Sequence, residues 1–473
     1  MMTIDRRPIR SAADLRGRRV IVLGLARSGV AAARFLADAG AEVTVYDRRS
    51  AGDLADAIAA LGIRPVRLAL GADEADAGAL IAAADVLVTS PSISPQFTTT
   101  EPWLRRALQD AGSRGTPVVS EVDLFLRLTA ARILAVTGTK GKTTTATLLA
   151  AMLDAAGLPH ALGGNIGTPL IEEAGVLTAE TWAVLELSEL QLPTISRGAD
   201  IAVYTNITAD HLDRHGSVEA YREVKSRLAR QTVMRGTVVL NADDPGCVEL
   251  ARGLAGEIQW YGLHDPALEA TVVDGQILVR GNVLMPAADV PLPGRHMLAN
   301  VLAAALGASL AGVPDDAIAA AIRGFVGVPH RLETVRVVGG VRFVNDSQAT
   351  IPEAAIAGVE SFGDAPIVLV AGGKDKGLDY RAFADAIAAR ARAAVLIGET
   401  ADELASLIGD RVPIVRADGM TGAVERAAGL ARRGDVVLLS PAAASFDMFV
   451  DYAARGDAFR AAVTDLSAVE AAE

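Results

Sequence analysis

The segment Val136-Thr137-Gly138-Thr139-Lys140-Gly141-Lys142-Thr143-Thr144-Thr145 sets the architecture expected of this chain. It follows an apolar run at residues 133–136 that is typical of a buried strand. An alanine- and leucine-rich helical pattern at residues 146–156 comes directly after it. A strand, a glycine turn and a helix in this order predict a phosphate-binding loop. Glycines let backbone N–H groups surround phosphate oxygens, and the helix directs its positive end toward them.

The side chains of this loop suit a nucleotide. Lys142 supplies a charge for the outer phosphates, and Thr143 stands where a nucleotide-binding loop places the hydroxyl that holds Mg²⁺. Val136 occupies the place of the first glycine of the full P-loop pattern, so the loop has the shorter Gly-x-x-Gly-Lys-Thr form. Glycines that only turn the chain would not require the flanking strand and helix. We therefore expect ATP to be bound by Gly138, Thr139, Lys140, Gly141, Lys142, Thr143 and Thr144.

Length and charge limit the possible classes of protein. A chain of 473 residues with 51% apolar content is long enough for about two to four domains with buried cores. Its 45 basic and 57 acidic residues give a net charge of -12, and the sequence has no basic block interleaved with aromatic residues. Nucleic acid is therefore not expected as a partner.

Cysteine content and hydropathy indicate a cytoplasmic protein. The single cysteine, Cys247, cannot form a disulfide framework, and the N-terminal residues are polar and charged. One uncharged stretch, residues 297–314, has membrane length, but it is mostly alanine and contains Asn300 and Pro314. We expect a buried helix there, no membrane association, and a monomer.

The N-terminal region opens with a βαβ pattern. Residues 19–24 predict a strand, residues 29–40 a helix, and residues 42–46 a second strand that ends at Asp47. The intervening turn resembles a dinucleotide fingerprint, except that Ala26 replaces the glycine that permits the closest approach of a pyrophosphate. Asp47 could read a ribose or could cap a helix, and the pattern does not choose between these roles.

Two further regions alternate strands with helices, which predicts mostly parallel sheets. The first starts at the phosphate loop, and its later part, residues 268–293, indicates a small antiparallel appendage. The second starts after Pro329. The strands expected in these two regions are residues 182–187, 201–206, 237–241 and 258–262, and then 367–370, 394–397, 414–416 and 436–439. Together with the N-terminal region, they predict an α/β protein of three units.

Polar side chains cluster where strands of the central sheet are expected to end. Glu186 ends one strand, His211 follows another, and Lys225 lies on the next helix. Because open α/β sheets bind ligands at these edges, Glu186, His211 and Thr143 could share a cation with phosphate oxygens. Taken singly, His211 would more often be a satisfied surface or core histidine, and Glu186 would usually be a helix cap. Their combination with the phosphate loop favours a metal site.

The order of these motifs resembles the Mur ligase family, and most closely its glutamate-adding members, over essentially the whole chain. The residues that carry the resemblance are Gly138 to Thr144, Gly163 to Gly167, Glu186-Leu187-Ser188 with Gln191-Leu192, Asp210 to Arg214, Tyr221 with Lys225, Gly294-Arg295-His296 with Asn300, Pro329 to Glu333, Asn345-Asp346-Ser347 with Ala349-Thr350, and Ser440-Pro441-Ala442 with Ala444-Ser445.

The resemblance implies a fold and a reaction. The expected domains are a Rossmann-like UDP-binding domain at residues 1–128, a central P-loop ATPase domain at 129–327 and a C-terminal Rossmann-like domain for the amino acid at 328–473. The implied activity is ATP-dependent ligation of D-glutamate to UDP-N-acetylmuramoyl-L-alanine, with Mg²⁺ and an acyl-phosphate intermediate, in peptidoglycan precursor synthesis. No side chain by itself reports the handedness of the glutamate.

Site roles carried over from the resemblance fall into three groups. Lys142 and Thr143 would contact phosphate and Mg²⁺, with Glu186 and His211 holding two metal ions. The nucleotide would also be held by Asn300, Arg331 and Asp346. The substrates would be held by Ser28, Asp47, Arg48 and Asn165 on the UDP-linked side and by Thr350, Lys376, Ser445 and Tyr452 on the amino-acid side. This chain departs from the family pattern at Lys140, Glu189-Leu190 and Gln348, which bears on substrate affinity.

The resemblance further implies that Lys225 is carbamylated by CO₂. An ammonium beside the metal site would repel Mg²⁺, whereas a carbamate is an anion that can hold a hard cation. The alternative for Lys225 is an ordinary solvated lysine on a helix face.

Other functions are alternatives to the ligase hypothesis. A ligase of this kind could use a different UDP-muramoyl species or a folate, but Ser28, Asp47 and Arg48 favour a uridine-linked substrate. A P-loop switch or motor would hydrolyse ATP in response to a macromolecule. A dinucleotide oxidoreductase would use the first domain, but Ala26 and the separate phosphate loop argue against it.

Overall fold

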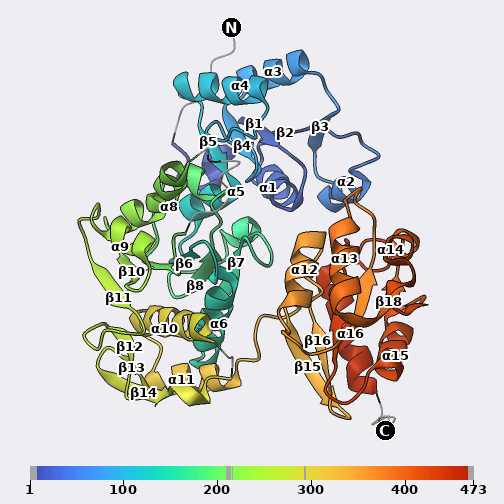
Figure 1. The fold of residues 1–473 in the computed structure, drawn as a ribbon. Coiled ribbons are helices and arrows are strands. Elements are labelled where there is room, and N and C mark those ends of the chain that lie inside the picture. Colours follow the sequence, from blue (N-terminus) through green and yellow to red (C-terminus); the bar gives the residue numbers. More distant parts are fainter. Residues whose placement is uncertain (1–7, 209–214, 216, 292–293, 467–473) are drawn as a thin grey trace. The chain divides into compact units, whose positions relative to one another are not determined.

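The computed structural model describes residues 8–208, 215, 217–291 and 294–466. The chain forms two compact units, Met1–Phe325 and Val326–Glu473. Two sheets lie in the first unit and one in the second (Figure 1). The α/β fold class is therefore as expected. The predicted domain limits at residues 128 and 327 stay predictions.

The N-terminal sheet is parallel, with strand order β3-β2-β1-β4-β5. Alternate residues of β1 point to opposite faces, so that Val20 and Val22 pack with α1, while Ile21 and Leu23 pack with α3 and α4. The predicted βαβ opening is confirmed, with the helix starting two residues earlier than expected. The elements are η1 (Ala12–Leu15), β1 (Arg19–Leu23), α1 (Arg27–Asp38), β2 (Glu42–Asp47), α2 (Ala55–Leu61), β3 (Val66–Leu70), α3 (Glu74–Ala83), β4 (Val86–Thr89), α4 (Pro102–Ser113), β5 (Val118–Ser120) and α5 (Glu121–Leu128).

The central sheet has nine strands in the order β14-β13-β12-β11-β10-β9-β6-β8-β7. Strands β6 to β12 pair in parallel, and β12, β13 and β14 pair antiparallel. The predicted antiparallel appendage is thus an extension of the same sheet. The strands are β6 (Arg132–Thr137), β7 (His160–Gly164), β8 (Trp182–Glu186), β9 (Ile201–Tyr204), β10 (Thr237–Asn241), β11 (Ile258–Tyr261), β12 (Ala270–Val273), β13 (Gln276–Val279) and β14 (Asn282–Pro286).

Helices cover both faces of the central sheet. α8 and α9 pack on the face that carries Ile133 and Ala135, and α6, α10 and α11 pack on the face that carries Leu134 and Val136. The remaining elements of the region are α6 (Lys142–Ala155), η2 (Leu170–Glu173), η3 (Leu192–Thr194), α8 (Val218–Thr232), α9 (Pro245–Ala251), η4 (Ala287–Asp289), α10 (Arg295–Leu310) and α11 (Asp315–Gly324).

The uncharged stretch at residues 297–314 is largely the helix α10, as expected. Its residues from Asn300 to Ala308 are buried against α6 and the sheet. Within the described parts of the chain, no helix combines the length and apolarity needed to cross a bilayer.

The second unit contains a six-stranded sheet in the order β15-β16-β20-β17-β18-β19. Only β15 and β16 pair antiparallel, through a turn at Gly339 and Gly340, both of which have positive φ. This hairpin was not predicted. The elements are β15 (Glu333–Val338), β16 (Val341–Asn345), α12 (Pro352–Glu360), β17 (Ile367–Gly372), α13 (Arg381–Arg390), β18 (Ala391–Ile397), α14 (Ala401–Ile408), η5 (Gly409–Arg411), β19 (Ile414–Arg416), α15 (Met420–Leu430), β20 (Val436–Leu439) and α16 (Tyr452–Asp465).

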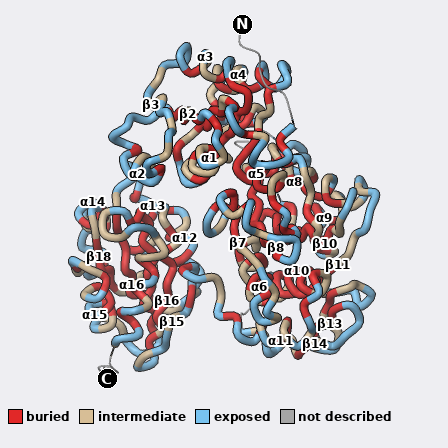
Figure 2. The backbone as a smooth tube through the Cα atoms, turned by 180° about the vertical axis from the view of Figure 1, so that it is seen from behind, coloured by how far each residue is buried: buried red, intermediate tan, exposed pale blue. Residues whose placement is uncertain are grey.

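The core of each unit lies on the two faces of its sheets, where the buried residues gather (Figure 2). Within the first unit, the N-terminal and central sheets also share polar contacts. Glu121 at the start of α5 accepts from the backbone N–H of Ile171 at 3.2 Å, and Thr194 donates to Ser120 at 2.7 Å. These contacts join the two sheets of this unit.

Candidate active site

The phosphate loop follows β6 as predicted, and its glycines are required by close contacts. Gly138 has φ +148°, and a Cβ there would lie 2.0 Å from Oγ1 of Thr205. Gly141 has φ +84°, and a Cβ there would lie 2.4 Å from Oδ1 of Asn300. Only glycine fits at both positions. The loop therefore lies directly against Asn300 of α10, for which the family resemblance implies a nucleotide contact.

Lys142 is the first residue of α6, and its ammonium folds back over the loop. Nζ donates to the carbonyl oxygens of Gly138 at 3.1 Å and Thr139 at 2.8 Å. Thr143 follows it and is buried. The ammonium is thus held at the start of α6, at the end of the helix that favours anions.

The loop is held from outside by Tyr221 of α8. The hydroxyl groups of Tyr221 and Thr139 lie 2.9 Å apart. The same threonine hydroxyl donates to the carbonyl of Thr208 at 3.1 Å, and the backbone N–H of Thr208 donates back at 3.0 Å. The conformation of the loop therefore depends on residues far from it in the sequence.

Lys225 is fully buried at the same loop, which excludes the solvated-lysine alternative. Its Nζ donates to the carbonyl of Gly138 at 2.9 Å and to Oγ1 of Thr137 at 3.3 Å, and it lies 5.5 Å from the ring centre of Tyr221. The helix that carries it begins after the cap Ser217, as expected. Lys225 therefore stands beside the phosphate loop.

Glu186 ends β8, which is the neighbour of β6 in the sheet, with Glu186 paired to Val136. Its side chain is almost completely buried. Oε1 accepts from Nδ2 of Asn165 at 2.7 Å, whereas Oε2 is buried and has no hydrogen-bond partner in the described structure. An unsatisfied buried carboxylate oxygen is costly, and a hard cation would satisfy it. The buried oxygen of Glu186 is thus of a ligand type that suits Mg²⁺.

Other metal ligands are not assembled in the described part of the chain. Residues 8–208, 215, 217–291 and 294–466 contain no group of three His, Cys, Asp or Glu side chains arranged to hold a metal ion. His211, the second predicted metal partner, lies outside the described residues.

The N-terminal domain has a cavity of about 480 Å³ at the carboxyl ends of β1, β2 and β4. Asp47 lies in its wall, with Oδ2 accepting from the backbone N–H of Leu25 at 2.8 Å and from Arg49 at 2.8 Å. Burial opposes ionisation, but the hydrogen bonds from Arg49 and Leu25 prevail and lower the pKa of Asp47 to about 2. The carboxylate is therefore a fixed anion that also holds the glycine turn.

Arg48 does not pair with Asp47 but with Glu101. Its guanidinium donates to Glu101 at 2.9 Å, and Nε1 of Trp103 donates to the other oxygen of Glu101 at 2.9 Å. Ser28 lies in the first turn of α1, on the turn that begins at Gly24. The arginine that pairs with Asp47 is Arg49, which the sequence did not single out.

Asp346 follows β16 in the second unit. Oδ2 accepts from the hydroxyl of Ser440 at 2.8 Å, and Oδ1 accepts from the backbone N–H of Leu332 at 3.2 Å. Burial raises the pKa of Asp346 to about 6. The bond to Leu332 fixes the backbone directly after Arg331, so two residues expected at the nucleotide are held together.

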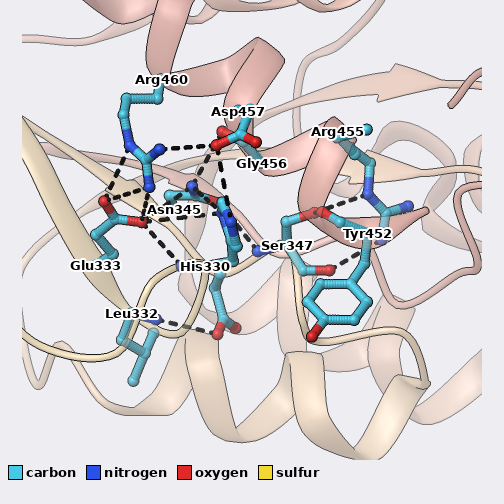
Figure 3. Close-up of polar contacts among 12 residues, drawn as sticks. His330, Leu332, Glu333, Asn345, Ser347, Tyr452, Arg455, Gly456, Asp457 and Arg460 are labelled. Atoms are coloured by element: carbon cyan, nitrogen blue, oxygen red, sulfur yellow. Dashed lines mark hydrogen bonds and ion pairs between the residues drawn. The ribbon is translucent and has the colours of Figure 1, made fainter. Parts of the chain in front are cut away.

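His330 anchors this segment to α16 (Figure 3). Its Nδ1 lies 3.0 Å from Nδ2 of Asn345, which also donates to the carbonyl of Gly456 at 3.1 Å. Glu333 accepts from the backbone N–H of His330 at 2.8 Å and from Arg460 at 2.9 Å. Burial lowers the pKa of His330, against the opposing charges of Asp457 and Glu333. These contacts join the segment before β15 to the end of β16 and to α16.

The predicted amino-acid contacts lie on loops after the strands of the second unit and on α16. Lys376 donates to the carbonyl of Thr350 at 3.2 Å. Ser445 is buried in the loop after β20, and its carbonyl accepts from the N–H groups of Met448 and Phe449. Tyr452 begins α16, and its carbonyl accepts from Ser347 at 2.7 Å. Sequence reasoning missed Arg455, because nothing in the local sequence distinguishes a buried arginine from an exposed one.

Three family profiles together cover most of the chain. The profile described as Mur ligase MurD-like, N-terminal domain, matches residues 18–120, the Mur ligase middle domain matches 136–308, and the Mur ligase, glutamate ligase domain, matches 330–443.

Curated relatives match over nearly the full length. The chain is 40% identical over 456 residues to the UDP-N-acetylmuramoylalanine--D-glutamate ligase of Solibacter usitatus, covering 96% of this chain and 99% of that one. It is 40% identical over 473 residues to the enzyme of that name from Anaeromyxobacter dehalogenans, with coverages of 96% and 99%. Among solved structures, UDP-N-acetylmuramate-alanine ligase of Thermotoga maritima has a TM-score of 0.54 at 17% identity, covering 95% of this chain and 99% of that chain, which supports the fold alone.

Proposed function

The chain belongs to the Mur ligase family, and from this membership we infer that it catalyses the ATP-dependent ligation of D-glutamate to UDP-N-acetylmuramoyl-L-alanine, a step of peptidoglycan precursor synthesis. The observation that carries this function is the 40% identity over nearly the whole of both chains. Curated ligases match all three regions of the chain. This match is not consistent with the alternative functions of a P-loop switch, a motor or a dinucleotide oxidoreductase.

We propose that the reaction proceeds by activation of a carboxyl group. The alanine carboxylate attacks the γ-phosphorus of ATP and releases ADP, and the amine of glutamate then displaces phosphate from the acyl phosphate. This route divides one difficult step into two easier ones. Both steps bring anions together, so the main contribution of the protein is alignment and stabilisation of negative charge.

Lys142 and the amides of the phosphate loop are proposed to supply that stabilisation. The ammonium lies over the loop, 2.8 Å from the carbonyl of Thr139, and is proposed to contact the outer phosphates of ATP. Asn300 contacts the loop at Gly141, which supports its proposed role at the nucleotide. Arg331 and Asp346 are proposed as further nucleotide contacts.

Two Mg²⁺ ions are proposed to bind at Thr143 and Glu186, with His211 as a further ligand. A metal titration would measure the number of ions bound. When bound, Mg²⁺ would neutralise charge on the phosphate oxygens. The orphaned Oε2 of Glu186 supports this assignment. Asn165 orients the same carboxylate through Oε1 and is proposed to contact the sugar-peptide arm of the substrate as well.

Lys225 is proposed to be carbamylated. It is buried beside Lys142 at the carbonyl of Gly138, so that two ammonium groups converge on one oxygen. Conversion of one of them to a carbamate would replace this repulsion with an attraction and would supply a ligand for a hard cation.

The substrate contacts are proposed in two places. Ser28, Asp47 and Arg48 border the cavity of the N-terminal domain or the turn beside it and would hold the UDP end. Thr350, Lys376, Ser445 and Tyr452 would hold the glutamate. We further propose that the enzyme is cytoplasmic and monomeric.

Release of phosphate tests the function. The purified protein would be incubated with ATP, Mg²⁺ and UDP-N-acetylmuramoyl-L-alanine, with D-glutamate, L-glutamate or no amino acid. We expect sustained phosphate release and a new UDP-linked product with D-glutamate only. A preference for L-glutamate, or release that requires neither small substrate, would contradict the proposal.

A further inference from the structure

Arg455 on α16 is a buried cation at the centre of the predicted glutamate contacts. Only 1% of the residue is exposed. Its guanidinium makes four hydrogen bonds, all to acceptors without a formal charge. Nε donates to Oγ of Ser347 at 3.0 Å and Nη2 to the carbonyl of Ser347 at 3.0 Å, while Nη1 donates to the carbonyls of Ala443 at 3.1 Å and Ala444 at 3.0 Å. Figure 3 shows the side chain directed at Ser347.

These bonds connect the loops that carry the predicted contacts. Ser347 lies three residues before Thr350, and Ala444 directly precedes Ser445. The carbonyl of Ala444 also accepts from the backbone N–H of Lys374 at 2.9 Å, which fixes the loop that carries Lys376.

The fourth predicted contact is on the same helix as the guanidinium. Tyr452 lies one helical turn before Arg455, and its carbonyl accepts from the Ser347 hydroxyl to which Arg455 donates. Arg455 therefore bonds directly to the segments that precede Thr350 and Ser445. It is linked to the Lys376 loop through Ala444 and to the Tyr452 carbonyl through Ser347.

The charge of Arg455 has no direct counter-ion. In the described structure, no carboxylate oxygen lies within 4.0 Å of the guanidinium, and Asp447 acts on it only as a more distant charge. Burial accordingly lowers the pKa of Arg455 to about 10, a value at which the group is still charged near neutral pH. A buried cation is costly unless an anion compensates it.

The same cation acts on a predicted substrate contact. Desolvation, and after it the charge of Arg455, lower the pKa of Lys376. Arg455 and Lys376 therefore act on each other as like charges, and Asp447 compensates Arg455 only as a more distant charge. Glutamate carries two carboxylates, which would compensate them on binding.

We propose that Arg455 is a positioning and specificity residue for the incoming amino acid: it helps to hold the three loops and the start of α16 that carry the four predicted contacts, and its buried charge favours an acidic amino acid as the compensating anion. This inference rests on the proposed function and adds a residue to it. The guanidinium acts by holding the loops through hydrogen bonds and by the electrostatic effect of its charge. It does not touch the reacting atoms.

Two variants distinguish the effect of the positive charge of Arg455 from the effect of its hydrogen bonds. R455Q removes the charge, and R455K keeps the charge but loses the planar fork that reaches three carbonyls at once. The control is R426Q on α15, where the arginine is exposed. Steady-state phosphate release would give KM for D-glutamate, ATP and UDP-N-acetylmuramoyl-L-alanine separately, and thermal unfolding with and without D-glutamate would report binding directly.

R455Q is expected to raise KM for D-glutamate by about tenfold or more, with both other KM values within about twofold of the parent. R455K is expected to give a smaller rise, about threefold. D-glutamate should raise the melting temperature of the parent and of R426Q, but not that of R455Q.

Three results would overturn the assignment: an unchanged KM for D-glutamate in folded R455Q, a parallel rise of all three KM values, or equal effects of R455Q and R455K. If R455Q does not fold, R455K decides, because a selective rise in KM for D-glutamate supports the assignment and an unchanged value rejects it. Failure of the proposed function is distinguishable, since the parent enzyme itself would then release no phosphate with D-glutamate.

Discussion

Lys142 and Lys225 donate to the same acceptor. Nζ of Lys142 lies 3.1 Å, and Nζ of Lys225 2.9 Å, from the carbonyl oxygen of Gly138. One lysine comes from the first turn of α6 and the other from the buried face of α8. Because both amines lie at the same carbonyl of the phosphate loop, we propose different roles for them. Lys142 acts as a cation, and Lys225 is the site of modification.

Lys142→Ala should be nearly inactive while folded. Removal of an ammonium that neutralises transferring phosphate oxygens should lower turnover about a hundredfold or more. Phosphate release is the measurement, and circular dichroism checks the fold. Arg252→Ala, which breaks an exposed ion pair with Glu249, should retain parental turnover. Near-normal phosphate release by Lys142→Ala would contradict the role of the loop.

Lys225→Ala should lose turnover more than substrate affinity, because the carbamate is proposed to hold a cation at the transferring phosphate and not to recognise the substrates. The sharper measurement uses the parent enzyme. CO₂ is stripped at mildly acid pH, activity is assayed in degassed buffer, and bicarbonate is then added.

Activity of the parent should fall on stripping and recover with bicarbonate, and the residual activity of Lys225→Ala should respond to neither step. Indifference of the parent to bicarbonate, together with a bare ammonium in a high-resolution map, would remove the carbamate from the mechanism.

Asp47→Ala should weaken binding of the UDP-linked substrate without weakening binding of ATP. Loss of the carboxylate leaves the Leu25 N–H without its 2.8 Å acceptor, which costs roughly 1–3 kcal/mol in a buried turn. Isothermal titration calorimetry with each ligand is the measurement. Asp73→Ala, which removes a helix cap elsewhere in the same domain, should leave both affinities unchanged. Unchanged affinity of Asp47→Ala for the UDP substrate, or binding of NADH by the parent, would refute the UDP role.

Glu121 should make the stability of the first unit fall as pH rises from about 4.5 to about 7. Burial raises the pKa of Glu121 from 4.5 to about 7, so in this range the folded state holds a proton that the unfolded state has released. Stability is therefore greatest below the unfolded pKa and is lost as pH rises toward the folded one. The loss is at most about 3 kcal/mol.

Glu121→Gln keeps an acceptor for the Ile171 N–H and should flatten this dependence. Urea unfolding at pH 5 and pH 8 would compare it with the parent and with Glu180→Gln, an exposed control. If parent and Glu121→Gln lose the same stability between these pH values, Glu121 is not buried in its neutral form.

The sequence alone determined the parts of this protein that depend on short-range pattern. The phosphate loop was readable because its glycines, Lys142 and Thr143 lie within a few residues of each other, between an apolar run and a helical pattern. The alternation of apolar strands with helices predicted the parallel sheets. The position of Glu186 at the end of a strand predicted that it lies near the loop, and Glu186 is paired with Val136. The hairpin of β15 and β16 was missed, although Gly339-Gly340 is a turn signal.

Only the tertiary structure decided which distant residues share a site and what burial does to them. Tyr221 reaches Thr139, and Arg455 reaches Ser347 and Ala444, across separations that no local period encodes. Desolvation and the surrounding hydrogen bonds fix the ionisation of a side chain, and both depend on the packing of many elements. A glutamate or an arginine in a sequence is therefore an ordinary charge, while Glu121 and Arg455 in this fold are buried groups whose charges the surrounding protein controls.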